Sequence, residues 1–273
     1  MLLFLICGLF SSGLQAKAPS RVISLNLCTD QLLMMLAEPE QVAGITSLAR
    51  DCSVSVLCQE AKRFPVIHSG TETLLTQRAD LVLGGDYTTT TASFATQSVG
   101  VRVVKFPPVN SLSEIPDQIR RMAELLGASA RGEAVIQVFN ERLASLSLPV
   151  RSDAPVAAIY TENGYITGKG SLPDDVLRHA GFRNFTATQG NGYTRSVPLE
   201  ILIAAHPDLL VSDPAGADVS LARSMLDNPA LRSTFEGPHR LVIPAARWLC
   251  GLPQTLDALV ALVRARQALK AGQ

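Results

Sequence analysis

The chain has 273 residues, and its 24 Lys and Arg balance 24 Asp and Glu, so the formal net charge is zero. Hydrophobic residues make up 47% and charged residues 18%. This composition excludes a disordered chain, which needs low hydrophobicity and high net charge. The lack of a basic excess argues against a nucleic-acid binder, and the length allows one large domain or two smaller ones.

The first sixteen residues have the pattern of a secretory signal. An apolar run over 2–10 is followed by small and polar residues, and Ala16 suits the position before a signal-peptidase cut. No Lys or Arg precedes the run, but it is too short to span a bilayer, which takes about 20 helical residues. We therefore expect 1–16 to be a signal peptide that is cleaved on export to the periplasm.

The mature chain begins with short β-rich runs that alternate with helical stretches, as parallel βαβ units do. Strands are expected at 21–26, 42–46, 80–85 and 101–104. The helix after the first strand has Thr29 or Asp30 as its expected N-cap. These elements predict an N-terminal α/β lobe over 20–126.

Strand signals then almost vanish between 111 and 148. Ser111 and Ser113 can cap a helix that ends near Leu125, and Gly127 marks a break. Apolar residues at helical spacing predict a long helix over 128–146. We expect 127–150 to bridge two halves of the molecule.

The alternation resumes after the bridge and predicts a C-terminal α/β lobe over 151–273. Its strands are expected at 155–160, 207–211 and 240–243, and its closing helix at 252–269. The alternative to two lobes is a single doubly wound sheet with one long crossover.

A short sequence pattern that occurs twice in the chain supports two lobes. The stretches 70–82 and 198–210 share a Glu, a short apolar helix and an Asp-Leu strand start. Glu72 and Glu200 are 128 residues apart, as are Asp80 and Asp208. Each glutamate could simply stabilise its helix by interacting with the helix dipole. Alternatively, the two glutamates could be exposed negative charges, one on each lobe, that dock a basic partner.

Export would allow disulfides among the cysteines that remain after the signal. Cys52 and Cys58 are close in a loop-like stretch and could close a small ring. Cys28 and Cys250 could pair across the fold or stay as two free thiols. The absence of a C-x-x-C pair argues against a cysteine-based zinc site.

The order of these features resembles the periplasmic substrate-binding proteins that feed ABC importers of cobalamin, haem and ferric siderophores. The run 21–25 resembles that family's first strand, and 166–185 resembles the opening of its second lobe. The runs 79–82 and 207–210 resemble its "P-D-L-V" strand starts, with Ala79 in place of the first proline. The resemblance covers nearly all of the mature chain and is strongest to the cobalamin-binding members.

The resemblance implies two Rossmann-like lobes bridged by a long α-helix, with the ligand cleft between the lobes. It implies a receptor without a cofactor or enzymatic activity, which delivers a metal chelate to an ABC permease. By match to the family's motifs, Glu72 and Glu200 would meet arginines on that permease. We expect the protein to work as a monomer and to bind no nucleic acid.

Ligands of open α/β folds sit at the carboxyl ends of strands, and the scarce aromatic residues cluster there. Aromatic side chains on such loops could form apolar walls for a flat ligand, and arginines could pair with its oxygens. The residues expected to face the cleft are Cys28, Thr29, Asp30, Arg50, His68, Tyr87, Tyr165, Tyr193, Arg195, Arg247 and Trp248. Sparse charge and several aromatics favour a corrinoid over haem or a ferric siderophore.

Two other classes of protein compete with a chelate receptor. A receptor for bare Zn²⁺ or Mn²⁺ needs several converging His and carboxylates, but only His68 is expected near the cleft, so no metal site is predicted. An exported hydrolase is the second alternative. The sequence lacks a G-x-S-x-G nucleophile elbow, which leaves Cys28 with a histidine as the remaining nucleophile pair.

Overall fold

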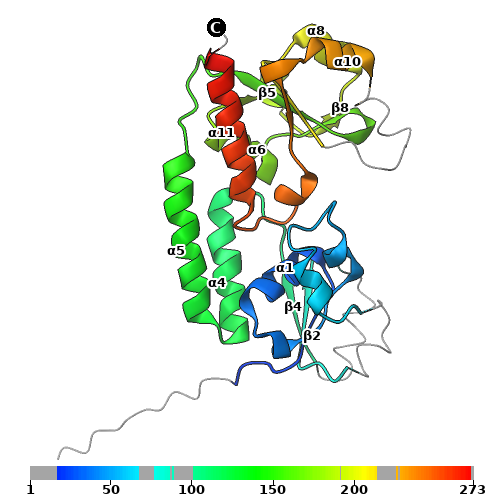
Figure 1. Ribbon diagram of the computed structural model, residues 1–273, viewed down its shortest axis with the longest axis vertical. Helices are drawn as coiled ribbons and strands as arrows, with labels where there is room; N and C mark the ends of the chain where they lie inside the picture. Colours follow the sequence, from blue (N-terminus) through cyan, green and yellow to red (C-terminus); the bar gives the residue numbers. More distant parts are fainter. Residues whose placement is uncertain are drawn as a thin grey trace, which may run out of the picture.

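The computed structural model describes residues 17–67, 77–86, 88, 101–190, 192–213, 226 and 228–271. Figure 1 shows two α/β lobes stacked along the long axis, with long helices running along one side of both. The predicted signal peptide 1–16 and three predicted site residues, His68, Glu72 and Tyr87, lie outside the described residues.

The first lobe contains a parallel four-stranded sheet. Its strands are β1 (Val22–Ser24), β2 (Val42–Gly44), β3 (Leu81–Gly85) and β4 (Arg102–Phe106), in the order β2-β1-β3-β4. The strands β1 and β3 are fully buried, which explains why they form continuous apolar runs in the sequence. The helix α1 (Leu27–Leu36) follows β1, and the short turns η1 (Pro39–Gln41), η2 (Ser47–Arg50) and η3 (Glu60–Arg63) follow.

The second lobe contains its own sheet, so the single-sheet alternative is wrong. Its strands are β5 (Val156–Tyr160), β6 (Tyr165–Ile166), β7 (Arg183–Asn184), β8 (Arg195–Ser196), β9 (Leu209–Ser212) and β10 (Arg240–Val242). They form the order β10-β9-β5-β6-β8, and β7 pairs with β5. Its helices are α6 (Leu172–His179), α7 (Phe185–Thr188), α8 (Leu199–Ala205), α10 (Pro229–Thr234) and α11 (Thr255–Ala271).

The two sheets repeat one arrangement. The parallel order β2-β1-β3-β4 of the first lobe corresponds to β7-β5-β9-β10 in the second. The two aspartates of the repeated sequence pattern also occupy equivalent positions, because each carboxylate accepts a hydrogen bond from a backbone N–H at the start of the neighbouring strand. Asp80 accepts from Arg21 at 3.1 Å, and Asp208 accepts from Val156 at 2.7 Å.

The start of α1 differs from the prediction. Asn26, in extended conformation, caps the helix by accepting from the N–H groups of Cys28 at 2.9 Å and Thr29 at 3.3 Å. Thr29 and Asp30 therefore lie inside the first turn, and neither is the N-cap. An asparagine accepts at this position as well as an aspartate does, so the helix begins three residues earlier than a Thr29 cap would allow.

A helical hairpin connects the lobes. The turn η4 (Leu112–Glu114) leads into α4 (Ile115–Leu126), and α5 (Ser129–Leu146) runs back along it after Gly127, which adopts a φ of +71°. Near its start, α5 is tied to the first lobe because Arg131 donates to the carbonyl of Leu36 at 2.6 Å. Near its end, Arg142 pairs with Asp257 of α11 at 2.9 Å. The helix thus makes a hydrogen bond to the first lobe and an ion pair with the second.

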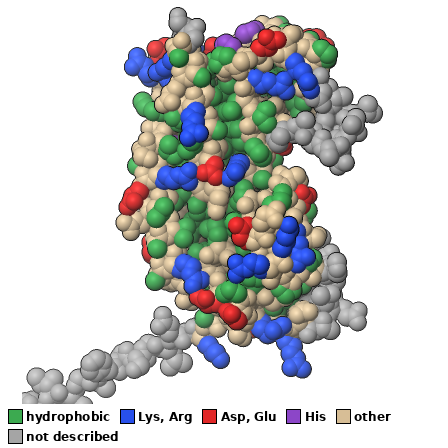
Figure 2. Space-filling view, in the orientation of Figure 1, with side chains coloured by type: hydrophobic (Ala, Val, Ile, Leu, Met, Phe, Trp, Pro, Cys, Tyr) green, Lys and Arg blue, Asp and Glu red, His purple; other side chains and the backbone are tan. Residues whose placement is uncertain are grey.

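Both pairs of cysteines form disulfides. Cys52 bonds to Cys58 within one loop, and Cys28 bonds to Cys250 across 222 residues of sequence. Within the described residues, no helix has the length and apolar character needed to cross a membrane. Figure 2 shows side chains of both charge signs spread over one face of the molecule, in keeping with the balanced composition.

Candidate functional site

A cavity of about 310 Å³ lies where the second lobe meets the segment that enters the helical hairpin. It is formed at the carboxyl ends of β5, β9 and β10, through Thr161, Asp213 and Ala245. The wall from the other side is Val109 and Asn110, which connect β4 of the first lobe to η4. Binding sites of parallel α/β sheets occur at this end of the strands.

The aromatic wall of the cavity is Trp248. It follows the turn η7 (Ala245–Arg247), and its backbone N–H donates to the carbonyl of Ala245 at 3.1 Å. Asp213, directly after β9, holds the start of this turn by accepting from the N–H of Ala245 at 3.2 Å. Trp248 is 8% exposed and is one of the residues that line the cavity.

The rest of the lining is apolar or neutral and polar. Leu249, which is 52% exposed, extends the apolar wall beside Trp248. Hydroxyl or amide groups come from Asn110, Thr161, Thr167, Ser171 and Ser212. Asp213 is the one charged side chain among the lining residues that the structure describes, and no Lys or Arg is among them. The site therefore combines a flat apolar wall with a rim of neutral hydrogen-bonding groups.

The predicted residues after the first strand are not free to meet a ligand. Cys28 is half of the disulfide to Cys250, which removes it as the thiol of a hydrolase. Thr29 is 1% exposed and its hydroxyl lies 2.8 Å from that of Ser24. Asp30 is 0% exposed and accepts from both the hydroxyl and the N–H of Thr46, at 2.5 Å and 3.2 Å.

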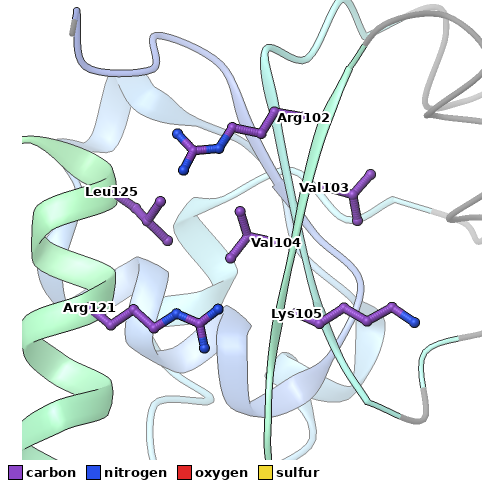
Figure 3. Close-up of a pocket in the computed structure, with 6 residues that line it drawn as sticks. All are labelled: Arg102, Val103, Val104, Lys105, Arg121 and Leu125. Carbon is purple, nitrogen blue, oxygen red and sulfur yellow. The ribbon is translucent and has the colours of Figure 1, made fainter.

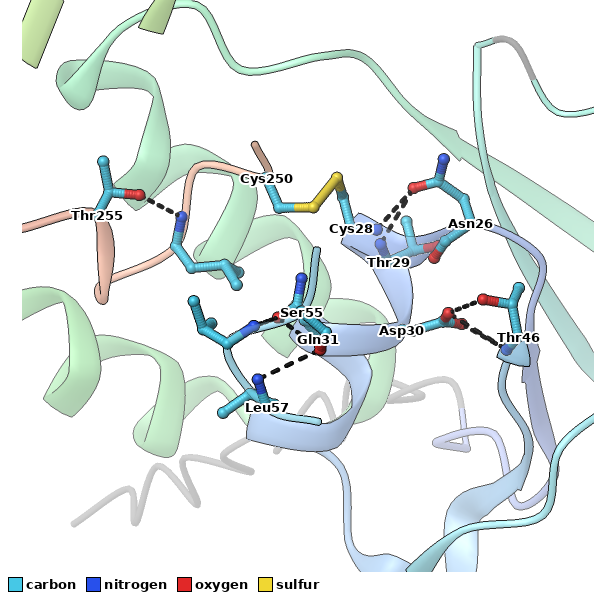
Figure 4. Close-up of a disulfide and its surroundings, with 12 residues drawn as sticks. Asn26, Cys28, Thr29, Asp30, Gln31, Thr46, Ser55, Leu57, Cys250 and Thr255 are labelled. Atoms are coloured by element: carbon cyan, nitrogen blue, oxygen red, sulfur yellow. Dashed lines mark hydrogen bonds between the residues drawn. A yellow bond between two sulfur atoms is a disulfide. The ribbon is translucent and has the colours of Figure 1, made fainter. Parts of the chain in front are cut away.

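The Asp30 carboxyl titrates at an unusual pH for an aspartate. Its burial raises the pKa from 3.8 to about 6, and the hydrogen bonds from Ser24 and Thr46 oppose that rise. Figure 4 shows this carboxyl pointing toward Thr46, on the opposite side of the helix from the disulfide. The group belongs to the core of the first lobe and not to the cavity.

Two predicted arginines are engaged within the protein. Arg50 donates to the carbonyls of Phe64 at 2.6 Å and Ala61 at 3.3 Å, and so fastens η2 to η3. Arg247 donates to Asp257 at 2.6 Å, and the same carboxylate also holds Arg142. Neither arginine lines the cavity, although both were expected to contact ligand oxygens.

The remaining predicted residues lie on the edge of the second sheet. Tyr165 is 49% exposed on β6, Arg195 is exposed on β8, and Tyr193 is 69% exposed just before it. Tyr165 is paired with Ser196 and Ile166 with Arg195. Residues that face one another across an antiparallel pair share a side of the sheet, so Tyr165 and Arg195 point to opposite sides. None of the three lines the cavity.

A second hollow lies beside the edge strand of the first lobe. This open groove of about 560 Å³ is lined by β4 and by Arg121 and Leu125 of α4. Figure 3 shows Arg102 and Val104 pointing toward α4 while Val103 and Lys105 point away. The guanidinium of Arg121 lies 4.6 Å from the centre of the Phe106 ring. The groove follows the side of the edge strand β4 and does not lie across the carboxyl ends of several strands, where ligands bind in this fold class.

The described histidines all have partners outside the cavity. His179 lies 2.9 Å from the hydroxyl of Ser147, His239 lies 2.9 Å from the carbonyl of Asp208, and His206 stacks on a phenylalanine. In the part of the chain that the structure describes, no group of three or more His, Cys, Asp or Glu could hold a metal ion.

The glutamate expected to dock a partner is accessible in the second lobe. Glu200 lies in the first turn of α8 and is exposed, whereas its neighbours Leu199 and Leu202 are buried. The helix therefore packs by its apolar side and presents the carboxylate to solvent.

Sequence reasoning missed most of the lining. Thr161 and Asp213 directly follow β5 and β9, and these positions could have been found from the strand ends alone. Thr167 and Ser171 precede α6, and Val109 comes from the other lobe. Their place in the cavity depends on how the lobes meet, which no local pattern reveals.

A family model described as periplasmic binding protein matches residues 22–234 of the chain. No curated protein sequence matches this chain. A periplasmic haem-binding protein from Roseiflexus sp. RS-1, in its apo form, has a TM-score of 0.72 and 22% identity, over 91% of this chain and 99% of that one.

Two further solved structures share the fold with other described ligands. The periplasmic vitamin B12 binding protein of Vibrio cholerae has a TM-score of 0.68 and 15% identity, over 92% of this chain and 98% of that one. A protein of an ABC-type Fe³⁺-hydroxamate transport system from Saccharomonospora viridis has a TM-score of 0.66 and 20% identity, over 91% of this chain and 93% of that one. At these identities the likeness shows the two-lobed fold.

Proposed function

The chain belongs to the periplasmic binding protein family, and from this premise we propose that it captures a metal chelate between its lobes and delivers it to an ABC importer. The family is one of binding proteins and not of enzymes, which supports a binding role for the cavity. The predicted signal peptide 1–16 supports export of the mature protein to the periplasm.

The observation that carries the proposal is the composition of the cavity beside Trp248. A flat indole, an exposed leucine and a rim of hydroxyl and amide groups suit a broad, largely apolar ring with polar substituents. Solved proteins of this fold are described as binding haem, vitamin B12 or ferric hydroxamate, which are all metal chelates.

The charge of the lining favours a neutral chelate such as a corrinoid over haem or an anionic siderophore. Haem carries two propionates and many ferric siderophores are anionic, so both call for cationic partners, whereas a neutral ferric tris-hydroxamate does not. The described lining offers one carboxylate, Asp213, and no Lys or Arg. A corrin ring carries neutral carboxamides around its edge, and these can bond to Thr161, Thr167 and Asn110 without a counter-charge.

The size of the cavity indicates how such a ligand would sit. Pockets that enclose a small-molecule ligand have volumes of about 300–1,000 Å³, and this cavity of about 310 Å³ is at the lower limit. A corrinoid would therefore insert one edge of its ring beside Trp248 and leave the remainder in the cleft between the lobes. The long helix α5, which runs along both lobes and contacts each of them, would keep the change in cleft width on binding small.

Calorimetric titration of the mature protein with cyanocobalamin, haemin and ferrichrome tests the proposal. We expect saturable binding of cyanocobalamin. Trp248→Ala should weaken that binding roughly tenfold, because an aromatic stacking contact contributes about 0.5–1.5 kcal/mol beyond the buried area. Trp248→Phe, which keeps a flat apolar ring, is the matched control and should retain most of the affinity.

Three outcomes would contradict the proposal. Binding of none of the chelates would remove the ligand class, and saturable binding of Zn²⁺ alone would favour the bare-ion receptor. An unchanged dissociation constant for Trp248→Ala would remove this cavity as the site, even if a chelate binds.

A further inference from the structure

We propose that the Cys28–Cys250 disulfide is a clamp between the lobes that fixes Trp248 in the wall of the cavity. The bond joins two segments that lie 222 residues apart in the sequence. That the cavity holds the ligand rests on the proposed function, whereas the clamp can be tested on the protein without any ligand.

Each half of the disulfide follows the carboxyl end of a strand. Cys28 lies in the first turn of α1, just after β1 of the first lobe, and Cys250 follows η7 at the end of β10 in the second. Figure 4 shows the bond running from the start of α1 to the segment that leads into the last helix. Because each strand end belongs to a different sheet, the bond ties the two lobes together and does not staple a single lobe.

The half of the clamp in the first lobe is attached to a fixed element. The N–H of Cys28 donates to the capping side chain of Asn26 at 2.9 Å, and the helix that it starts packs into the core through Leu32, Leu33 and Leu36. The Cys250 side chain is itself buried at 5% exposure. The covalent bond therefore links Cys250 to a rigid part of the opposite lobe.

The constraint on Cys250 reaches Trp248 through a short and ordered stretch. Only Leu249 separates the two residues, and the N–H groups of Trp248 and Leu249 both donate to the carbonyl of Ala245, at 3.1 Å and 3.0 Å. Two residues span about 7 Å at most even when fully extended. Trp248 can therefore move away from the cavity only if this turn opens or Cys250 moves with it.

The other contacts of this segment are not covalent. Trp248 and Cys250 pack in the buried apolar core that the lobes share. The ion pair between Arg247 and Asp257 joins two residues of the second lobe, so it does not tie the segment to the first. Gly251 packs closely against Val109, but this contact has no directional bond. The disulfide is thus the one covalent tie between the Trp248 segment and the first lobe among the residues that the structure describes.

The experiment compares two double variants of the mature protein, Cys28→Ala with Cys250→Ala, and Cys52→Ala with Cys58→Ala. The second pair is the matched control, because it removes a disulfide by the same substitutions within a single loop of the first lobe. Trp248 is the only tryptophan of the chain, so its emission reports on this wall alone. The readouts are the emission maximum, quenching by acrylamide, and hydrogen exchange of a peptide covering 245–251.

Loss of Cys28–Cys250 is expected to shift the emission to longer wavelength, to increase the acrylamide quenching constant and to speed exchange in 245–251. Loss of Cys52–Cys58 should leave all three at their wild-type values. Wild-type values for the Cys28–Cys250 variant would overturn the clamp, and so would equal changes in both variants, since these would report a general loss of stability.

If the Cys28–Cys250 variant does not fold, the same test is made by reduction. The folded Cys52→Ala, Cys58→Ala protein is treated with a water-soluble phosphine, so that only Cys28–Cys250 can react. The phosphine and one water convert the disulfide into two thiols, and the phosphine becomes its oxide. Unchanged Trp248 emission after complete reduction, checked by mass spectrometry, would overturn the clamp. Failure of the chelates to bind would instead count against the proposed function and leave these readouts unaffected.

Discussion

Asp30 is a carboxyl group held in the core of the first lobe, where it has no contact with solvent. Its burial raises the pKa to about 6, above its ordinary 3.8, so the folded protein favours the neutral form. Both oxygens accept from the N–H of Thr46, and one of them also accepts a hydrogen bond from its hydroxyl. The Asp30 side chain therefore links the first helix to the segment after β2, and its contribution to the free energy of unfolding depends on pH.

The substitution Asp30→Asn should remove this pH dependence. Because the folded-state pKa is above the unfolded value, the contribution of Asp30 to the free energy of unfolding is fully present below pH 3.8 and is lost as the pH rises through about 6. A shift of this size corresponds to about 3 kcal/mol. Urea unfolding between pH 4 and 7 should show the variant gaining stability relative to wild type by about that amount.

Asp80→Asn is the control with the opposite sign. Partial burial acts to raise the pKa of Asp80, but hydrogen bonds from Ser20 and Arg21 outweigh it and hold the pKa below its ordinary value. Its stabilising contribution is present above the unfolded pKa and is lost as the pH falls, so this variant should lose stability most at neutral pH. Parallel pH profiles for wild type and Asp30→Asn would show that the Asp30 carboxyl does not titrate as described.

At the scale of elements, the segment after η7 depends on a glycine. Gly251 has a φ of +58°, and a Cβ on it would lie 2.6 Å from the Cβ of Val109. Gly237 has a similar φ of +55°, but a Cβ there would meet nothing within 4 Å. The two glycines share the backbone requirement and differ in the close approach between lobes.

This pair separates backbone strain from packing. Gly237→Ala should cost about 1–2 kcal/mol, the penalty of an L-residue in the left-handed region. Gly251→Ala should cost that and about 1–3 kcal/mol more, because the new methyl overpacks the contact with Val109. The reduced entropy of the unfolded chain is the same for both and cancels. Equal losses in urea unfolding would mean that the lobes do not pack here.

Much of the element pattern could be predicted from the sequence. The strands β1, β3, β5 and β9 are buried on both faces, and they form short apolar runs in the sequence. Gly127 follows α4 and adopts a positive φ, so the glycine correctly predicted the end of this helix. The strands β6, β7 and β8 have two residues each, too few for any periodic signal.

The site could be predicted only in part. Trp248 was predicted because aromatic residues on loops that follow strands could form apolar walls for a flat ligand, and it lines the cavity. Arg50 and Arg247 looked like ligand contacts, but their partners are a carbonyl and a carboxylate that only the tertiary fold brings near. Pairing of Cys28 with Cys250 was one of two alternatives, because sequence carries no information on which distant thiols meet.

At the scale of the whole molecule, delivery to a permease requires a surface distinct from the cavity. Glu200 is exposed on α8, and it is not among the residues that line the cavity. If it docks a basic surface of the permease, reversing its charge should weaken docking and leave ligand affinity intact.

The variant Glu200→Lys tests this separation. Uptake of labelled cyanocobalamin by cells that depend on this protein should fall, while calorimetry on the purified variant should give the wild-type dissociation constant. Glu236→Lys, another exposed glutamate of the second lobe, is the control and should transport normally. A loss of ligand affinity in Glu200→Lys, or equal loss of uptake in both variants, would contradict a docking role. Glu72 lies outside the described residues, so its equivalent variant remains a prediction from the sequence.

The binding of a chelate beside Trp248 is tested most directly by the emission of Trp248 during titration of the wild-type protein with cyanocobalamin. The chain has a single tryptophan, and the corrin chromophore absorbs where tryptophan emits, so a ligand bound in the cavity must quench it. We predict saturable quenching that ends at one equivalent, with free tryptophan amide at the same absorbance as the correction. Binding seen by calorimetry with no quenching of Trp248, or no binding at all, would contradict a chelate held between the lobes at this wall.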